Sequence, residues 1–218
     1  MIHKSYLNKI VGIVPQFFIL ILIVSAFTGC NKANNEIYHS GKNWNYVVEL
    51  SDTTYTFTSL SLETQSGMFS LFQNKIIWKS EYIDNTNGGK VSATSTTGVY
   101  EENDRIWLHP PRFGPLKILE AFPFPDVRFP MKINDSWSNS ITVIRGFEEL
   151  NGQKIKSSYT LTDIKGDSIF EIYAKSNLES LGSKFEAYFT FHRKKGFTDF
   201  RFVQDSTNII EIKLIESL

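Results

Sequence analysis

The stretch KFEAYFTFH, residues 184–192, decides the fold class. Phe185, Ala187, Phe189 and Phe191 recur at every second position, and polar or amphipathic side chains stand between them. Successive side chains of a β-strand point to opposite faces of a sheet, so this period of two predicts a strand with one buried face. No segment downstream of Trp44 shows the 3.6-residue apolar period of a helix over twelve residues.

The same alternation recurs on both sides of this stretch and is punctuated by turn signals such as Asn151-Gly152 and Lys195-Gly196. Ser136–Leu218 therefore reads as about six strands joined by short loops, and such strands usually pair with their neighbours in sequence. The candidate strands of the first half are Trp44–Leu50, Thr54–Leu62, Gly67–Phe72, Lys75–Ile83, Lys90–Tyr100 and Arg105–His109. We predict a mostly β protein, a single antiparallel meander domain that forms a curved sheet, half-barrel or barrel, with a proline-rich insertion.

One candidate strand is unusually polar. Ser92–Thr97 is a run of small hydroxyl side chains around Ala93, so it offers little apolar surface on either face. We expect this segment at a sheet edge or at a site of close packing.

The proline-rich insertion is Pro110–Pro130, which holds six of the seven prolines. Proline lacks the N–H that a sheet requires, so this window cannot be a central strand. It also carries Phe113, Phe122, Phe124 and Phe129, which a solvated loop would not favour. Two interpretations remain open: the window closes the core, or it forms the rim of a pocket. A buried Phe124 predicts a loss of about 3–5 kcal/mol for Phe124→Ala, whereas an exposed rim predicts little change.

The first thirty residues carry a targeting signal. Lys4 and Lys9 precede an apolar stretch from Ile10 to Phe27 that is too short and interrupted for the ~20 apolar residues of a membrane-spanning helix. This pattern is typical of a secretory signal peptide. Phe27-Thr28-Gly29-Cys30 then resembles the bacterial lipobox, with Phe27 in place of the usual leucine. The resemblance implies cleavage before Cys30 and acylation of its thiol, the only one in the chain. The alternatives are an ordinary signal peptide or a buried structural cysteine.

The following residues suggest the compartment. The polar, Asn-rich tether and the aromatic-rich body resemble lipoproteins of Bacteroidota-type bacteria. In that group an acidic run after the cysteine directs export to the surface, but here only Glu36 is acidic. The resemblance therefore implies an outer-membrane lipoprotein that faces the periplasm. We predict a signal peptide over residues 1–29, an acylated cysteine and tether over 30–40, and one β-rich domain over 41–218.

Composition excludes several classes of function. Hydrophobic residues make up 41% of the chain, which is too many for a disordered tail. The formal charge of zero argues against a nucleic-acid partner, which needs a basic surface. One cysteine and scattered histidines predict no metal site, and no phosphate loop or nucleophile elbow is present, so no cofactor is expected.

The cluster around His109 and Arg112 is the one candidate site. His109 ends an apolar strand, and Arg112 can hold a carboxylate or phosphate with two parallel hydrogen bonds. The competing interpretation is that both side chains brace a loop. The residues that we single out for possible ligand contact are His109, Arg112, Phe113, Phe122 and Phe124.

Three classes of function stay open. The leading one is a non-catalytic, lipid-anchored envelope protein that binds an apolar ligand or a partner protein, because a curved sheet leaves a concave apolar face. The second is a structural or assembly subunit of an outer-membrane complex, bound through an edge strand. The third is a hydrolase of glycan or lipid, for which a glycosidase would need two carboxylates across a cleft.

Overall fold

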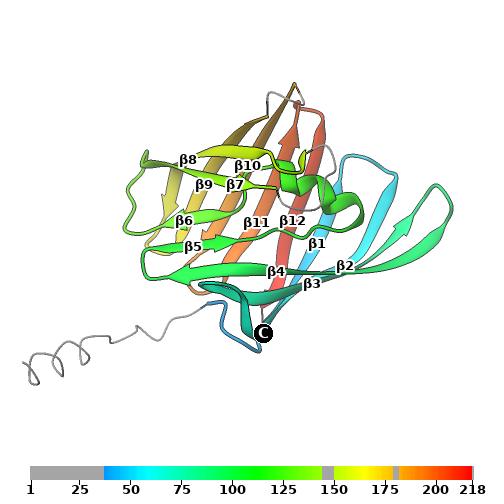
Figure 1. The fold of residues 1–218 in the computed structure, drawn as a ribbon, viewed down its shortest axis with the longest axis horizontal. Helices are drawn as coiled ribbons and strands as arrows, with labels where there is room; N and C mark the ends of the chain where they lie inside the picture. Colours follow the sequence, from blue (N-terminus) through cyan, green and yellow to red (C-terminus); the bar gives the residue numbers. More distant parts are fainter. Residues whose placement is uncertain (1–36, 144–149, 179–181, 218) are drawn as a thin grey trace, which may run out of the picture. The chain divides into compact units, whose positions relative to one another are not determined.

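The computed structural model describes residues 37–143, 150–178 and 182–217, and these form one antiparallel sheet with a single short helix (Figure 1). The elements are β1 (Asn43–Leu50), β2 (Tyr55–Ser70), β3 (Gln73–Asp84), β4 (Gly89–Glu102), β5 (Arg105–Leu108), the 3-10 helix η1 (Gly114–Ala121), β6 (Asp126–Arg128), β7 (Ser136–Thr142), β8 (Lys154–Lys165), β9 (Ile169–Leu178), β10 (Ser183–His192), β11 (Gly196–Gln204) and β12 (Asn208–Ser217).

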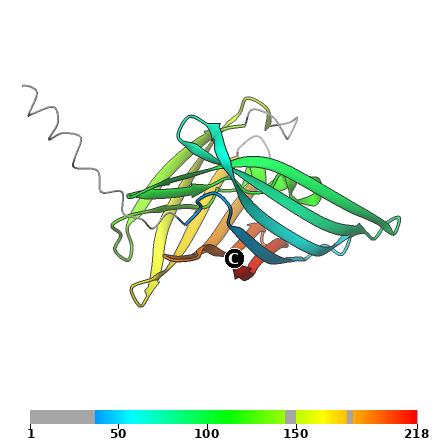
Figure 2. The same cartoon turned by 90° about the horizontal axis from the view of Figure 1, so that it is seen from below.

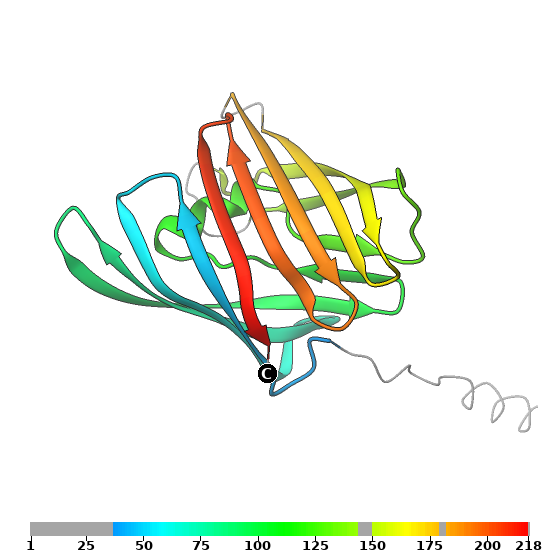
Figure 3. The same cartoon turned by 180° about the vertical axis from the view of Figure 1, so that it is seen from behind.

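The sheet has 12 strands in the order β6-β5-β4-β3-β2-β1-β12-β11-β10-β9-β8-β7. The predicted mostly β meander is thus confirmed, and it is a curved sheet that does not close. Strands β1 to β6 each pair with the next strand in sequence, and so do β7 to β12. The two halves join where β1 pairs with β12, from Trp44 opposite Ser217 to Leu50 opposite Ile210. These two strands lie side by side on the outer face (Figure 3).

The two edge strands of the sheet, β6 and β7, are consecutive in the chain but do not pair in a ladder. Two side chains bridge the halves there instead. The guanidinium of Arg128 donates to the carbonyl of Ser138 at 3.1 Å, and the hydroxyl of Tyr159 donates to the carbonyl of Phe124 at 2.9 Å. The sheet therefore curls until its edges meet through side chains.

In β2 the structure differs from the sequence-based expectation. Thr54–Leu62 and Gly67–Phe72 were expected as separate strands, yet Tyr55–Ser70 is one strand of 16 residues. Gly67 adopts φ +100°, and the register with β3 shifts between Gln65 and Met68. A glycine in this conformation makes a β-bulge that bends the strand without ending it. In the sequence alone, the same glycine indicates a turn.

The polar stretch of β4 lies at a sheet edge, as predicted. Residues from Gly89 to Val99 pair with β3, whereas β5 pairs only with Val99–Glu102. Of the described strands, none adds a second ladder to β4 along Lys90–Thr97. Small hydroxyl side chains suit this position, since they leave no apolar surface at the free edge.

The proline-rich window fills the inside of the curved sheet. Leu116, Leu119 and Phe122 are buried, and the Phe122 ring lies 5.0 Å from that of Phe185 and 5.3 Å from that of Phe202. The Ser176 hydroxyl in β9 donates to the carbonyl of Ala121, which ties the end of η1 to the sheet. Prolines hold this segment in one path while its apolar side chains complete the core.

No helix in the described residues is both long and apolar enough to cross a membrane. Cys30 and the predicted signal peptide lie outside the described residues.

Candidate functional site

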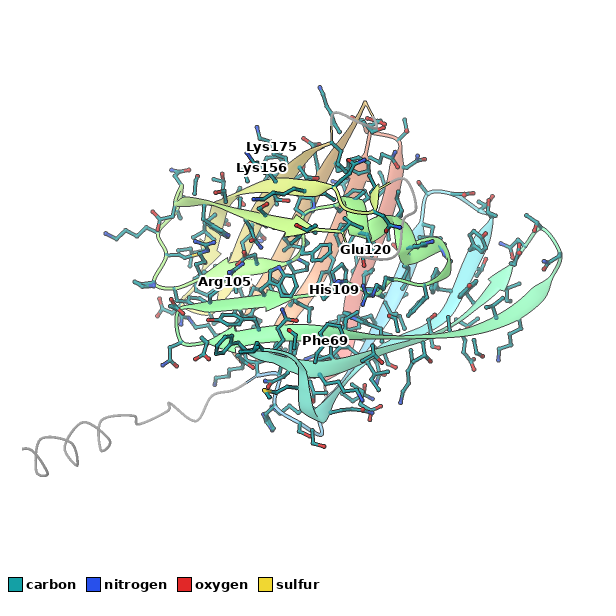
Figure 4. The ribbon with its side chains drawn as sticks, viewed as in Figure 1. Phe69, Arg105, His109, Glu120, Lys156 and Lys175 are labelled. Atoms are coloured by element: carbon teal, nitrogen blue, oxygen red, sulfur yellow. The ribbon has the colours of Figure 1, made fainter. Side chains whose placement is uncertain are left out.

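A pocket of about 680 Å³ lies between the edge of the first half of the sheet and the end of β7. Its labelled residues converge from the β2–β3 hairpin, from the end of β5 and from η1 (Figure 4). The lining residues are Phe69, Ser70, Gln73, Ser95, Thr96, Trp107, His109, Arg112, Glu120, Phe124, Ile141 and Thr142. This volume falls within the roughly 300–1,000 Å³ of small-molecule sites in proteins.

One wall of the pocket is aromatic. The Phe124 ring lies 4.7 Å from the His109 ring and 5.7 Å from the Trp107 ring, centroid to centroid. In β5, Ile106 and Leu108 are buried, so alternation turns Trp107 to the opposite face, toward the pocket. Rings in these tilted arrangements form a rigid apolar surface that can bind a hydrocarbon chain.

The polar part of the pocket consists of three side chains that meet at one carboxylate oxygen. Oε1 of Glu120 lies 3.5 Å from Nε2 of His109 and 3.7 Å from a terminal nitrogen of Arg112. Glu120 is at the end of η1 and is buried, whereas Arg112 keeps 28% of its side chain exposed. The cation therefore faces both the carboxylate and the solvent-accessible space of the pocket.

Burial keeps His109 neutral. The pKa of its imidazole is lowered from 6.5 to about 4, mainly by desolvation and in part by the nearby charge of Arg112, while a backbone hydrogen bond to Pro110 opposes the shift. Nδ1 lies 2.8 Å from the carbonyl of Pro110, to which it donates, so Nε2 carries the lone pair. The contact between His109 and Glu120 is therefore not an ion pair at neutral pH.

Burial also holds the proton on Glu120. Desolvation raises the pKa of its carboxyl from 4.5 to about 7, and the charge of Arg112 opposes this shift only in part. Near neutral pH the carboxyl of Glu120 is thus partly protonated. When it is protonated, Arg112 carries the one full charge of this cluster.

Two buried polar atoms at the pocket lack hydrogen-bond partners. They are Nε1 of Trp107, a donor, and Oε1 of Glu120, for which no donor in the described part of the chain lies in hydrogen-bond geometry. Buried polar groups in native proteins are nearly always satisfied, so these atoms indicate where a ligand or water binds.

The structure brings together three of the predicted ligand-contact residues. His109, Arg112 and Phe124 line the pocket, whereas Phe113 and Phe122 are buried and are not among its lining residues. Phe124 is 3% exposed, so it serves the core and the pocket wall at once. Phe124→Ala alone therefore cannot separate the two interpretations of the proline-rich window.

Sequence reasoning missed Glu120 and Trp107. Glu120 stands alone among apolar neighbours, in Ile118-Leu119-Glu120-Ala121-Phe122, and a single carboxylate inside an apolar run is the signal that could have found it. Trp107 escapes notice because aromatic residues usually are buried, so a tryptophan in an apolar strand indicates a core position.

Two further observations limit the chemistry. The described residues contain no group of three or more His, Cys, Asp or Glu side chains that could hold a metal ion. A second hollow of about 520 Å³ is lined by Lys156, Lys175 and Lys184 (Figure 4), but all three lysines are exposed and solvated. The pocket around Glu120 is therefore the better candidate site.

No known protein-family profile matches this chain, and no curated protein matches it. Solved structures of similar fold include a presumed exported protein with a YmcC-like fold from Bacteroides fragilis NCTC 9343, with 8% identity and a TM-score of 0.46. A presumed lipoprotein from Parabacteroides distasonis ATCC 8503 is similar at 10% identity and a TM-score of 0.42. Each comparison covers 83% of this chain and 96% of the other chain.

Proposed function

We propose that this chain is a lipid-anchored envelope protein, non-catalytic, whose pocket binds an apolar ligand with an anionic head group. The observation that carries this proposal is the position of Arg112 at the border of an aromatic wall. No described residue accepts a hydrogen bond from its guanidinium, and its nearest carboxylate oxygen lies 3.7 Å away. The cation is therefore available to a carboxylate or phosphate, while Trp107 and Phe124 contact the hydrocarbon part.

The pocket does not support a glycosidase. That chemistry needs two carboxylates on opposite sides of the scissile bond, and Glu120 is the one carboxylate among the described lining residues. Binding, with no covalent step, is what an aromatic wall and one available cation support.

The free edge of β4 favours a second candidate function, that of an assembly subunit. Backbone groups along Lys90–Thr97 face no neighbouring strand in the described residues, so a strand of a partner protein can pair there. The two sites overlap at Ser95 and Thr96, which belong to this edge and also line the pocket.

Removing the charge of Arg112 is expected to abolish the preference for an anionic ligand. We expect a soluble form lacking residues 1–34 to bind decanoate about tenfold or more tightly than 1-decanol, since hydrogen bonds to charged groups contribute about 1.5–3 kcal/mol. Arg112→Gln should bind both compounds alike. Displacement of a fluorescent fatty acid measures both affinities.

Arg201→Gln is the matched control, because Arg201 pairs with Glu211 on the surface at 3.1 Å and does not line the pocket. The control should keep the preference for decanoate. An Arg112→Gln protein that still prefers decanoate would show that another group holds the head group.

Replacing Cys30 tests the anchor. Metabolic labelling with an alkyne fatty acid should mark the wild-type protein and leave Cys30→Ser unlabelled, because acylation needs the thiol. The signal peptide is unchanged in this variant, so export can continue. Equal labelling of both proteins would contradict acylation at Cys30.

A further inference from the structure

The hairpin between β2 and β3 ends in an exposed apolar tip, which we define as Met68, Phe69, Leu71 and Phe72. Met68 is 76% exposed, Leu71 78% and Phe72 74%. Single exposed apolar residues are common on protein surfaces, but a cluster of large ones marks a surface that contacts something apolar.

The chemistry of the apolar tip is that of a membrane-inserting loop. From Thr64 to Asn74 the chain contains no charged residue, and the first charge beyond it is Lys75. A loop without charge can enter the interface of a bilayer, since burying a charged side chain there costs far more than burying an apolar one.

The apolar tip, which is the turn between β2 and β3, lies at the end of the sheet where β1 begins (Figure 2). The amide of Gly41 donates to the carbonyl of Thr64 at 3.0 Å, and the Thr64 hydroxyl donates to the carbonyl of His39. Met68 follows four residues later in β2, about 13 Å along the strand. Six residues lie between Cys30 and Ile37, and the seven Cα–Cα steps that join these two positions span at most about 25 Å, so an anchor at Cys30 keeps the apolar tip within reach of the membrane.

A basic turn lies at the same end of the sheet. Arg193, Lys194 and Lys195 connect β10 to β11 and are exposed. The Arg193 guanidinium lies over the rings of Phe129 and Phe170, 4.8 Å and 4.9 Å from their centroids, so Lys194 and Lys195 supply the cations that face the solvent. The carbonyl of Lys195 accepts a hydrogen bond from the Trp44 indole at 2.7 Å, and this contact places the basic turn beside the start of β1. Clustered basic side chains next to an apolar loop match the anionic head groups of a phospholipid surface.

We propose that this end of the sheet docks on the phospholipid bilayer that holds the Cys30 acyl chains, with the apolar tip inserted into the interface. The proposal rests on the lipid anchor of the proposed function and adds a second contact with the membrane. It also explains the position of Phe69, which belongs to the apolar tip and lines the pocket. A pocket whose rim lies in the bilayer interface can exchange an amphipathic ligand with the membrane without passing it through water.

A fluorophore on the apolar tip tests this contact. The full chain, processed to its acylated form and carrying Leu71→Cys labelled with the environment-sensitive dye NBD, is reconstituted into vesicles of phosphatidylethanolamine and phosphatidylglycerol. We expect a blue-shifted emission that lipids with a nitroxide near the head group quench. Thr207→Cys is the matched control, because Thr207 is exposed in the β11–β12 turn at the opposite end of the sheet, and it should emit as in water.

Each outcome decides the proposal. Quenching at position 71 together with its absence at position 207 supports it. A water-like emission at position 71 overturns it, whether or not the protein floats with the vesicles. A blue shift at position 71 that appears without vesicles and vanishes on dilution also overturns it, since a second copy of the chain would then cover the apolar tip. Flotation and NBD labelling of wild-type Cys30 report separately on the anchor, and decanoate binding reports on the pocket.

Discussion

Phe122→Ala is expected to lower the free energy of unfolding by about 3–5 kcal/mol, the usual cost of deleting a buried aromatic side chain. Phe122 is 1% exposed and packs edge-on against Phe185 and Phe202. It belongs to the proline-rich window, not to the sheet, so its loss leaves a cavity inside the curved sheet. Prolines on both sides of this segment limit how far the backbone can move to fill that cavity.

Urea unfolding of a soluble form lacking residues 1–34 measures this loss. Phe72→Ala is the matched control, because it removes the same side chain from a position that is 74% exposed. The control should stay within about 0.5 kcal/mol of the wild type. If Phe122→Ala were as stable as the control, the window would be an accessory flap and would not complete the core.

Glu120→Gln is expected to become more stable than the wild type as the pH rises, with a relative gain of about 3 kcal/mol between pH 4 and pH 8. The unfolded chain releases the proton of Glu120 near its ordinary pKa of 4.5, whereas the folded chain holds it up to about 7. Between these values the folded state binds more protons, so wild-type stability falls as the pH rises through this window. Each unit of pKa corresponds to about 1.4 kcal/mol. Glutamine does not ionise, so the variant does not lose this stability as the pH rises.

Urea unfolding at pH 4, 6 and 8 measures this difference. The charged and titratable groups that face Glu120 are Arg112 and His109, and both remain in the variant. His109 has a lowered pKa of about 4, so its own contribution rises with pH in both proteins and largely cancels in the comparison. A difference that does not change with pH would mean that Arg112 keeps Glu120 ionised in the folded state throughout.

The same substitution also affects the proposed ligand. Ionised Glu120 offsets the charge of Arg112, so wild-type affinity for decanoate should fall from pH 6 to pH 8. In Glu120→Gln this affinity should stay constant over that range. The displacement assay with a fluorescent fatty acid checks both proteins.

Local pattern was sufficient to predict most of the strands. The alternation of Phe185, Ala187, Phe189 and Phe191 matches the burial of all four side chains in β10. The polar stretch of β4 lies at an edge, as its lack of apolar surface indicates. Period and turn chemistry depend on neighbours in sequence, so they can be deduced without any tertiary structure.

The candidate site could be predicted only in part. His109 and Arg112 stood out because a histidine and an arginine flank two prolines, and both line the pocket. Glu120 joins them from η1, and Ile141 joins from β7, across the gap between the two edges of the sheet. No sequence spacing reveals that these segments meet, since the curl of the whole sheet brings them together.

The sequence by itself determined the strand period, the turns, the apolar character of the proline-rich window and the lipobox-like junction at Cys30. Only the tertiary structure decided that β1 pairs with β12, that β6 and β7 do not pair, and that the proline-rich window turns inward. The physical reason is the same in each case. The whole chain determines which distant strands pair and which segment fills the concave face, because the favoured arrangement buries the most apolar surface in total. The sequence of one segment does not contain that information.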